Sequence, residues 1–256
     1  MTLLCIDVGN THTVFGLFDG DLIAEHWRVG TFDRRTADEW AVVFSGLLGQ
    51  HADGIDGVAL CSTVPTVLHE MREMLSRHYA GVRSVVVEPG VRTGVPVLMD
   101  NPREVGTDRI LNALAASTLH PGPAIVVDLG TATTFDVVSA RGEYVGGAIA
   151  PGIEVSLEAL GAKGAQLRRV ELMRPRSVVA KNTVEALQSG AVYGFAAQID
   201  GIVTRMIDEL HWDTADVTVI VTGGLAPFAV EECRTSLVHE PWLTLIGLRM
   251  VFARTA

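Results

Sequence analysis

The sequence is poor in cysteine, and the three that it has are scattered. Cys5, Cys61 and Cys233 show no CxxC spacing, so the sequence indicates neither a zinc site nor a disulfide framework. Cys5 and Cys61 lie inside apolar runs and are expected to be small core residues. A reducing, cytoplasmic compartment is therefore the expected location.

Long apolar runs are also missing. No stretch approaches the roughly 18 residues that a membrane-spanning helix needs. The N-terminus lacks the basic segment and the long apolar stretch of a secretory signal. We therefore expect neither a signal peptide nor a membrane partner.

Positive charge is scarce as well, with 20 Lys and Arg against 30 Asp and Glu and a net charge of −10. This balance argues against nucleic acid as the main partner, because binding a phosphate backbone needs a basic face. It does not exclude a nucleotide, which needs only a few donors. The 256 residues are 48% hydrophobic and 20% charged, which predicts an ordered chain with one large domain or two of ordinary size.

A phosphate-binding hairpin is predicted near the N-terminus. The apolar residues 3–6 run into Asp7, a turn over Gly9, Asn10 and Thr11 follows, and an apolar strand resumes. Glycine lets a ligand approach the backbone, and successive N–H groups in such a turn can form an anion-binding concavity. The structural alternative is that Asp7 only caps backbone N–H groups of the turn.

The same pattern returns in the second half of the chain. Residues 124–138 match the opening stretch at one offset (128 − 7 = 121), which pairs Asp7 with Asp128, Gly9 with Gly130 and Thr13 with Thr134. A repeat of this length predicts two duplicated domains. The His120-Pro121-Gly122-Pro123 segment interrupts a helix, so the boundary is placed between domains 1–119 and 120–256.

Apolar periodicity places the other elements. Helices are predicted over residues 38–50, 66–78, 154–160 and 184–210, and a further helix is predicted to follow Thr107 as its N-cap. Strands are predicted at residues 22–24, 57–61, 84–87 and 217–221. Residues 146–152 are interpreted as a glycine-rich loop, and residues 243–252 as a short apolar element.

Two Asp-x-Gly hairpins and a late Gly223-Gly224 turn after a strand resemble the superfamily of actin, hexokinase, acetate kinase and the heat-shock ATPases. In that superfamily the three features are the phosphate-1, phosphate-2 and adenosine motifs. The resemblance implies an α/β fold of two duplicated actin-like (ribonuclease H-like) domains. Each domain has a mixed five-stranded sheet flanked by helices, and the nucleotide cleft lies between them. A plain turn is the alternative interpretation of Gly223-Gly224.

Four motifs in a fixed order resemble the type III pantothenate kinases. They are Asp7-Val8-Gly9-Asn10-Thr11, Gly106-Thr107-Asp108-Arg109, Asp128-Leu129-Gly130-Thr131-Ala132-Thr133 and Gly146-Gly147-x-x-x-Pro151-Gly152. The resemblance spans essentially the whole chain. It implies transfer of the ATP γ-phosphoryl group to the primary hydroxyl of pantothenate. The product, 4'-phosphopantothenate, is the first intermediate toward coenzyme A.

The resemblance also implies which residues bind the nucleotide and the metals. Asp7 suits Mg²⁺, directly or through water, because hard cations prefer carboxylate oxygens. Asp128 is expected to bind a monovalent cation, K⁺ or NH₄⁺. The expected nucleotide contacts are Ile6, Asp7, Val8, Gly9, Asn10, Thr11, His12, Thr13 and Thr131. His12 is otherwise a turn residue rather than a catalyst.

Asp108 is the expected general base. It lies in the first turn of a predicted helix, where the helix dipole stabilises an anion by roughly 0.3–1 kcal/mol. Arg109 offers a fork of donors for a polar or anionic substrate group. By resemblance, Gly106, Thr107, Asp108 and Arg109 contact pantothenate, and Thr183 of the other subunit of a homodimer adds a contact.

Structural alternatives stay open for these residues. Asp108 could only cap its helix, Arg109 could pair with Asp108 or Glu104, and Thr183 could be an N-cap. One position departs from the family: many relatives have a tyrosine where this chain has Asp100, which puts an aromatic contact to pantothenate in doubt. Two other functions compete, a non-catalytic relative that assists transcription and a kinase of the same superfamily with another substrate.

Overall fold

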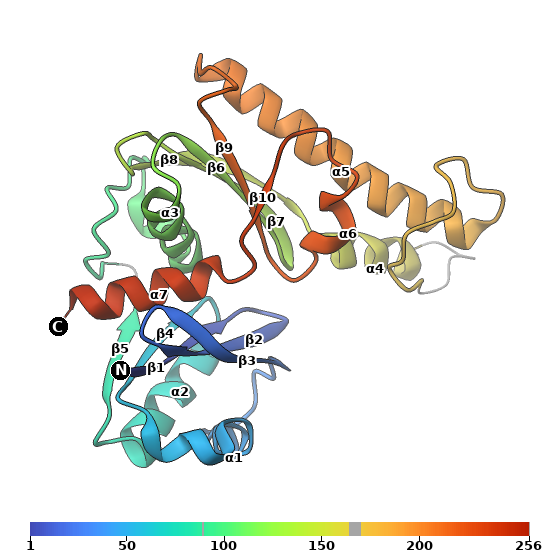
Figure 1. Cartoon of the computed structure of the whole chain (residues 1–256). Helices are drawn as coiled ribbons and strands as arrows, with labels where there is room; N and C mark the ends of the chain where they lie inside the picture. Colours follow the sequence, from blue (N-terminus) through green and yellow to red (C-terminus); the bar gives the residue numbers. More distant parts are fainter. Residues whose placement is uncertain (89, 164–169, 256) are drawn as a thin grey trace. The chain divides into compact units, whose positions relative to one another are not determined.

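The computed structural model describes residues 1–88, 90–163 and 170–255. The chain divides into two compact units, each an α/β unit with one five-stranded sheet (Figure 1). Unit 1 comprises Met1–Val95, Asp100–Ala115 and Leu243–Ala256, and unit 2 comprises Pro96–Met99 and Ala116–Trp242. This division differs from the boundary predicted at 119/120 in that the C-terminal segment belongs with the N-terminal sheet.

The sheet of unit 1 has the order β3-β2-β1-β4-β5. Its strands are β1 (Thr2–Val8), β2 (His12–Asp19), β3 (Leu22–Gly30), β4 (Gly57–Ser62) and β5 (Arg83–Val87). The first three strands form an antiparallel meander, and β4 and β5 run parallel to β1. Because β1 is the central strand, its carboxyl end lies between two neighbours and places Asp7 beside both of them.

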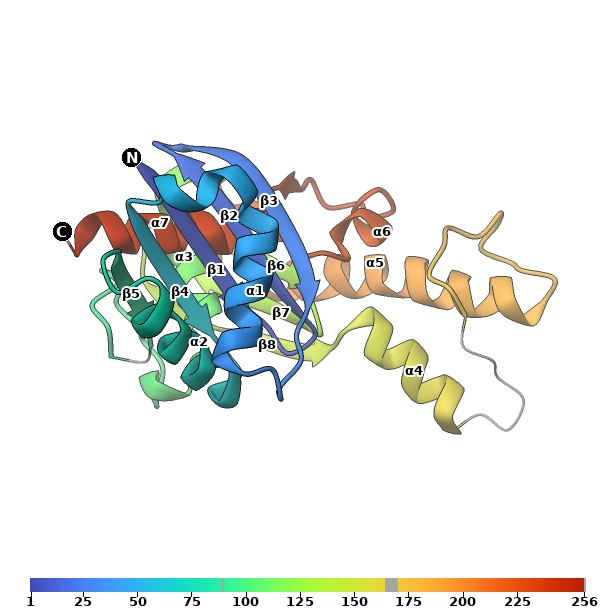
Figure 2. The same cartoon turned by 90° about the horizontal axis from the view of Figure 1, so that it is seen from below.

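Helices α1 (Ala37–Leu48) and α2 (Pro65–His78) cover one face of this sheet (Figure 2). The chain starts α1 with a capping box, in which Thr36 and Glu39 bond each other's backbone N–H groups. Trp40, Phe44 and Met71 are buried with the apolar residues of β1 and β4. A 3-10 helix, η1 (Gly49–Gly54), follows α1.

The other face packs against α7 (Leu243–Arg254), the short apolar element of the sequence. Here the sheet residues are small: a Cβ on Gly57 would lie 2.2 Å from the Phe252 ring, and one on Gly16 would lie 2.8 Å from Leu245. Because Gly57 and Gly16 have no side chains, α7 can lie close to the sheet. The remaining helical elements at the end of the first half are η2 (Pro102–Glu104) and α3 (Thr107–Leu119).

The sheet of unit 2 has the order β10-β9-β6-β7-β8. Its strands are β6 (Ala124–Leu129), β7 (Ala132–Val138), β8 (Tyr144–Pro151), β9 (Thr218–Thr222) and β10 (Val238–His239). Its helices are α4 (Ile153–Lys163), α5 (Thr183–Glu209) and α6 (Ala226–Val230). Apolar residues of α5 and α6 share a core with β6, β7 and β9. Among the described residues, no helix is long and apolar enough to cross a membrane.

The predicted duplication is confirmed, because the two sheets have the same order and the same strand directions. One detail of the match was wrong. Val8 pairs with Thr13 in the first hairpin, and Leu129 pairs with Thr133 in the second. The second turn is one residue shorter, so the register makes Thr133, not Thr134, the counterpart of Thr13.

Two local predictions were also wrong. Residues 146–151 lie in strand β8 and not in a loop, because they pair along β7 from Val137 to Ala132. Gly146 has φ +154° beside the bulge at Val137/Val138, which accommodates glycine within the strand. Thr107 is the first residue of α3 and not its N-cap, since the Ile110 N–H donates to the Gly106 carbonyl at 3.3 Å.

Gly247→Ala is predicted to destabilise unit 1. A Cβ on this α7 residue would lie 2.3 Å from the backbone oxygen of Leu111 in α3, so the backbone must shift, at a cost of about 1–3 kcal/mol. The matched control is Gly46→Ala in α1, where a Cβ meets nothing within 4 Å and alanine should stabilise the helix by about 0.5–1 kcal/mol. Urea unfolding measures both. A Gly247→Ala protein as stable as wild type would contradict the close packing.

Candidate active site

The first hairpin turns over residues 9–11, between β1 and β2. The Gly9 N–H donates to the His12 carbonyl at 3.0 Å and closes the turn. Asn10 and Thr11 are exposed there, as a phosphate-binding turn requires. Thr13 is buried, and its hydroxyl lies 2.9 Å from the hydroxyl of Thr31.

The eight expected nucleotide contacts of this hairpin therefore differ in what they can offer. Ile6 and Val8 are buried core residues, so they can meet a nucleotide only through backbone atoms. Gly9 and His12 are partly exposed. Asn10 and Thr11 offer both side chain and backbone, which makes the turn itself the exposed polar part of the hairpin.

Asp7 lies at the carboxyl end of β1, opposite Cys61 in the parallel ladder. The buried Cys61 thiol donates a hydrogen bond to Asp7 Oδ1 at 3.3 Å. Desolvation by the surrounding protein, together with the negative charge of Asp108, raises the pKa of Asp7 to about 7, although the bond from Cys61 opposes the rise. The side chain keeps partial exposure, so water moderates the shift.

Asp108 lies in the first turn of α3, and Gly106 makes room for it. A Cβ on Gly106 would lie 2.4 Å from Asp108 Oδ1, so any larger residue there would push the carboxylate aside. Asp108 is partly exposed, as is Arg109 beside it, whereas Thr107 is buried. Asp7 and Asp108 both belong to unit 1, and after burial the negative charge of Asp108 is the next cause of the raised pKa of Asp7.

The second hairpin has the same layout in unit 2. Asp128 is partly exposed at the end of β6, and Thr131 is exposed in the turn. A Cβ on Gly223 would lie 2.6 Å from Asp128 Oδ1, and Gly223 has φ +92°. The Gly152 N–H donates to the Thr131 carbonyl at 3.1 Å, with no space for a Cβ. The Gly223 turn therefore packs directly against the aspartate, which a plain surface turn need not do.

Thr183 is the first residue of α5 and is exposed. The N-cap is Asn182, whose side chain accepts from the Glu185 N–H at 2.9 Å, so the capping interpretation of Thr183 was wrong. Asp128, Thr131 and Thr183 belong to unit 2, whereas Asp7 and Asp108 belong to unit 1.

Cys61 is a candidate that sequence reasoning missed, because an apolar run made it appear to be an ordinary core residue. The signal lies in the pairing of β1 with β4, which the structure shows and the sequence alone does not. Any residue of β4 that lies opposite Asp7 has its side chain on the same face of the sheet.

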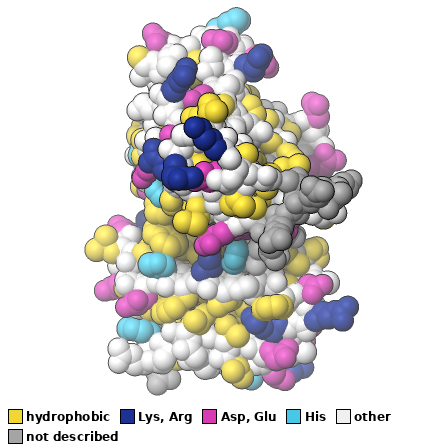
Figure 3. Space-filling model, turned by 90° about the vertical axis from the view of Figure 1, so that its right-hand side faces the viewer, with side chains coloured by type: hydrophobic (Ala, Val, Ile, Leu, Met, Phe, Trp, Pro, Cys, Tyr) yellow, Lys and Arg dark blue, Asp and Glu magenta, His cyan; other side chains and the backbone are white. Residues whose placement is uncertain are grey.

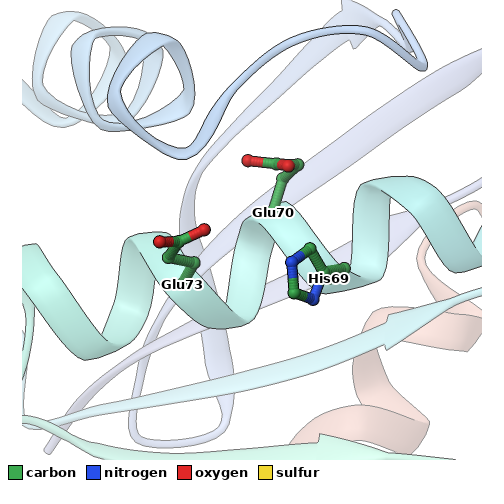
Figure 4. A group of neighbouring side chains, drawn as sticks. All are labelled: His69, Glu70 and Glu73. Carbon is green, nitrogen blue, oxygen red and sulfur yellow. The ribbon is translucent and has the colours of Figure 1, made fainter.

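A second group of possible metal ligands lies on α2. His69, Glu70 and Glu73 could bring one ligand atom each within 4.8 Å of one another (Figure 4). Both carboxylates already have protein partners, since Glu70 accepts from the Ala37 N–H and Glu73 pairs with Arg77. A cavity of about 480 Å³ borders the first two residues of this group. These contacts explain the group as surface structure.

Structural comparison supports the fold. The chain is similar to the activator of the 2-hydroxyisocaproyl-CoA dehydratase from Clostridium difficile with bound ADPNP, with a TM-score of 0.55 and 12% identity over 100% of this chain and 96% of that one. It is also similar to the ROK hexokinase from Thermus thermophilus, with a TM-score of 0.53 and 14% identity over 100% and 99%. At these identities the likeness shows a shared fold and no more.

Sequence comparison is more specific. A family model described as type III pantothenate kinase matches residues 3–205. The chain is 67% identical over 257 residues to the type III pantothenate kinase of Thermobifida fusca, covering 98% of this chain and 99% of that one. It is 66% identical over 259 residues to that of Streptomyces avermitilis, covering 98% of each. The chain therefore belongs to the type III pantothenate kinase family.

Proposed function

We propose that this chain transfers the γ-phosphoryl group of ATP to the primary hydroxyl of pantothenate, with Asp108 as general base. The observation that carries the proposal is the placement of Asp108 in the first turn of α3, in the same unit as Asp7, whose pKa is raised by burial and then by the negative charge of Asp108. Phosphoryl transfer needs an acceptor for the hydroxyl proton and a nearby group that positions metal and phosphate. Two neighbouring carboxylates can divide these tasks.

Asp108 is suited to accept the proton. Its carboxylate lies at the N-terminus of α3, where the helix dipole favours the ionised form. Gly106 leaves the space that this carboxylate occupies. Arg109, partly exposed at the next position, can orient a polar group of pantothenate so that the hydroxyl faces Asp108.

The residues fit a divalent cation. The negative charge of Asp108 acts on Asp7, and carboxylate oxygens are the ligands that Mg²⁺ prefers. Asp7 would hold it, directly or through water. The cation would neutralise phosphate charge that develops during transfer. Asn10, Thr11 and the Gly9 backbone are placed to hold phosphate oxygens.

The second hairpin is assigned the remaining ligands. We assign Thr131 to the nucleotide and Asp128 to a monovalent cation, K⁺ or NH₄⁺. The exposure of Thr131 and the packing of the Gly223 turn against Asp128 support this assignment. Asp100 is exposed where many relatives carry tyrosine, so pantothenate is expected to bind without that aromatic contact.

We further propose a homodimer in which Thr183 contributes to the partner's site. Support comes from exposed apolar side chains near the start of α5 and on α4: Val178, Val179, Val184, Val155 and Leu160.

Acidic side chains lie among the Lys and Arg side chains on the face seen in Figure 3, and we expect no nucleic-acid partner. Three free thiols agree with a cytoplasmic location.

A substrate screen tests the function. Purified protein with ATP, Mg²⁺ and K⁺ is offered pantothenate, hexoses or acetate, and release of ADP is measured together with the phosphorylated product. Phosphopantothenate formed in equal amount to ADP is the expected result. Turnover of a sugar or acetate alone would indicate another kinase of the superfamily, and no turnover with any substrate would favour a non-catalytic role.

Asp108→Asn is predicted to lower kcat by about 10²–10⁴-fold, the usual contribution of a general base. Asparagine keeps the shape of the side chain but cannot accept the proton, so the fold should be retained. Glu104→Gln is the matched control, because it neutralises an exposed carboxylate four positions earlier. Near-normal turnover of Asp108→Asn would show that another group is the base.

The raised pKa of Asp7 predicts how stability without Mg²⁺ depends on pH. Between about pH 4 and 7 the folded state binds a proton that the unfolded state releases, so this group's contribution falls as pH rises and stays low above 7. The change in the free energy of unfolding that Asp7→Asn causes should therefore be about 2 kcal/mol more favourable at pH 8 than at pH 5.

Urea unfolding at the two pH values measures this difference. Asp19→Asn, at an exposed end of β2, is the control for the loss of a carboxylate. Equal effects of Asp7→Asn at pH 5 and pH 8 would mean that Asp7 ionises normally in the folded protein.

Mixing two inactive variants tests the contribution of Thr183. If Thr183 contributes to the partner's site, no active site is intact in a dimer of the Thr183→Arg variant. The same holds for a dimer of the Asp108→Asn variant. Hybrid dimers should regain one intact site, from the Asp108 of one subunit and the Thr183 of the other. Subunit exchange followed by a kinetic assay should restore up to about a quarter of wild-type activity. No recovery, with exchange verified by mass spectrometry, would contradict the shared site.

A further inference from the structure

The environment of Cys61 differs from that of an ordinary core cysteine. Cys61 lies on β4 directly opposite Asp7, with its Sγ 3.3 Å from Asp7 Oδ1. Gly57 and Ala59 lie on the same face of the same strand, and neither has a side-chain donor. Among these three residues of β4, Cys61 is therefore the side-chain donor, and it lies at the position that pairs with Asp7.

The Cys61 thiol is the donor in its contact with Asp7 Oδ1. A protonated thiol is a weak donor, and an ionised carboxylate is acceptor-only. The bond therefore runs from sulfur to oxygen and favours one orientation of the Asp7 side chain.

The second repeat places a similar residue in the corresponding position. Thr222 on β9 pairs with Asp128 as Cys61 on β4 pairs with Asp7. Thr222 is buried like Cys61, and its hydroxyl is also a short donor group. Both repeats thus put a compact S–H or O–H side chain on the parallel neighbour of the strand that carries the aspartate.

We propose that Cys61 is a positioning residue for Asp7: its thiol binds Oδ1 and fixes the carboxylate so that Oδ2 is left for the cation. This inference rests on the proposed function of Asp7. Cys61 is fully buried, so its effect on the reaction runs through Asp7. Its loss should weaken the binding of Mg²⁺ more than it slows the chemical step.

Kinetics of three variants test the proposal. Cys61→Ala should raise the Mg²⁺ concentration for half-maximal velocity by about 3- to 10-fold, the loss expected for one hydrogen bond, with kcat at saturating Mg²⁺ little changed. Cys61→Ser restores a donor and should recover most of this loss. Cys5→Ala is the matched control, because Cys5 is a buried thiol two residues from Asp7 on the same face of β1.

A spectroscopic readout tests the bond without activity. The S–H stretching band of Cys61 is isolated by subtracting the infrared spectrum of Cys61→Ala from that of the wild type. It should lie at lower frequency than the band of Cys5, isolated with Cys5→Ala. Asp7→Asn should shift the Cys61 band upward, because a neutral amide oxygen is a weaker acceptor than a carboxylate.

The outcomes separate the inference from the function. If the wild type phosphorylates pantothenate but Cys61→Ala and Cys5→Ala need the same Mg²⁺ concentration, Cys61 is only a core residue. An S–H band that ignores Asp7→Asn would overturn the hydrogen bond itself. If the wild type does not phosphorylate pantothenate, the proposed function fails, and the infrared experiment still decides whether the bond exists.

Discussion

Repulsion between two carboxylates is the constraint on which the site depends. Asp7 lies near the carboxyl end of the central strand of unit 1, and Asp108 lies in the first turn of α3. Burial raises the pKa of Asp7, and the negative charge of Asp108 raises it further. In the unfolded chain the two negative charges would separate. The folded protein holds them in one unit at a cost in free energy, and burial increases that cost because it disfavours the ionised carboxylate. A cation bound at Asp7 would reduce the repulsion, so the fold itself favours the binding of Mg²⁺ at this position.

The rest of unit 1 can be understood as support for this pair. Asp7 is held at a fixed place because β1 pairs with strands on both sides, and Asp108 has its place because Gly106 leaves space. Helix α7 packs on the same face of the sheet, over the glycines of β2 and β4. The chain's last helix therefore stabilises the sheet that carries the residues assigned to metal binding, and its contacts lie far from them in sequence.

Much of this arrangement could be predicted from the sequence. The two Asp-x-Gly hairpins gave the duplicated sheets, because apolar runs bounded by Gly and Asn turns have few other solutions. Three features could not be predicted. Residues 146–151 form a strand although glycine disfavours one, since pairing with β7 overrides propensity. The shorter second turn shifts the match from Thr134 to Thr133. The contact of Cys61 with Asp7 exists only through pairing of strands distant in sequence.

The most direct measurement is the titration of Asp7 itself by nuclear magnetic resonance. The ¹³Cγ signal of Asp7 is assigned with Asp7→Asn and followed with pH in protein free of Mg²⁺. The account predicts a midpoint near 7 in the wild type and a lower midpoint in Asp108→Asn, where the neighbouring charge is gone. A midpoint near 4, or one that Asp108→Asn leaves unmoved, would contradict the pairing of the two carboxylates.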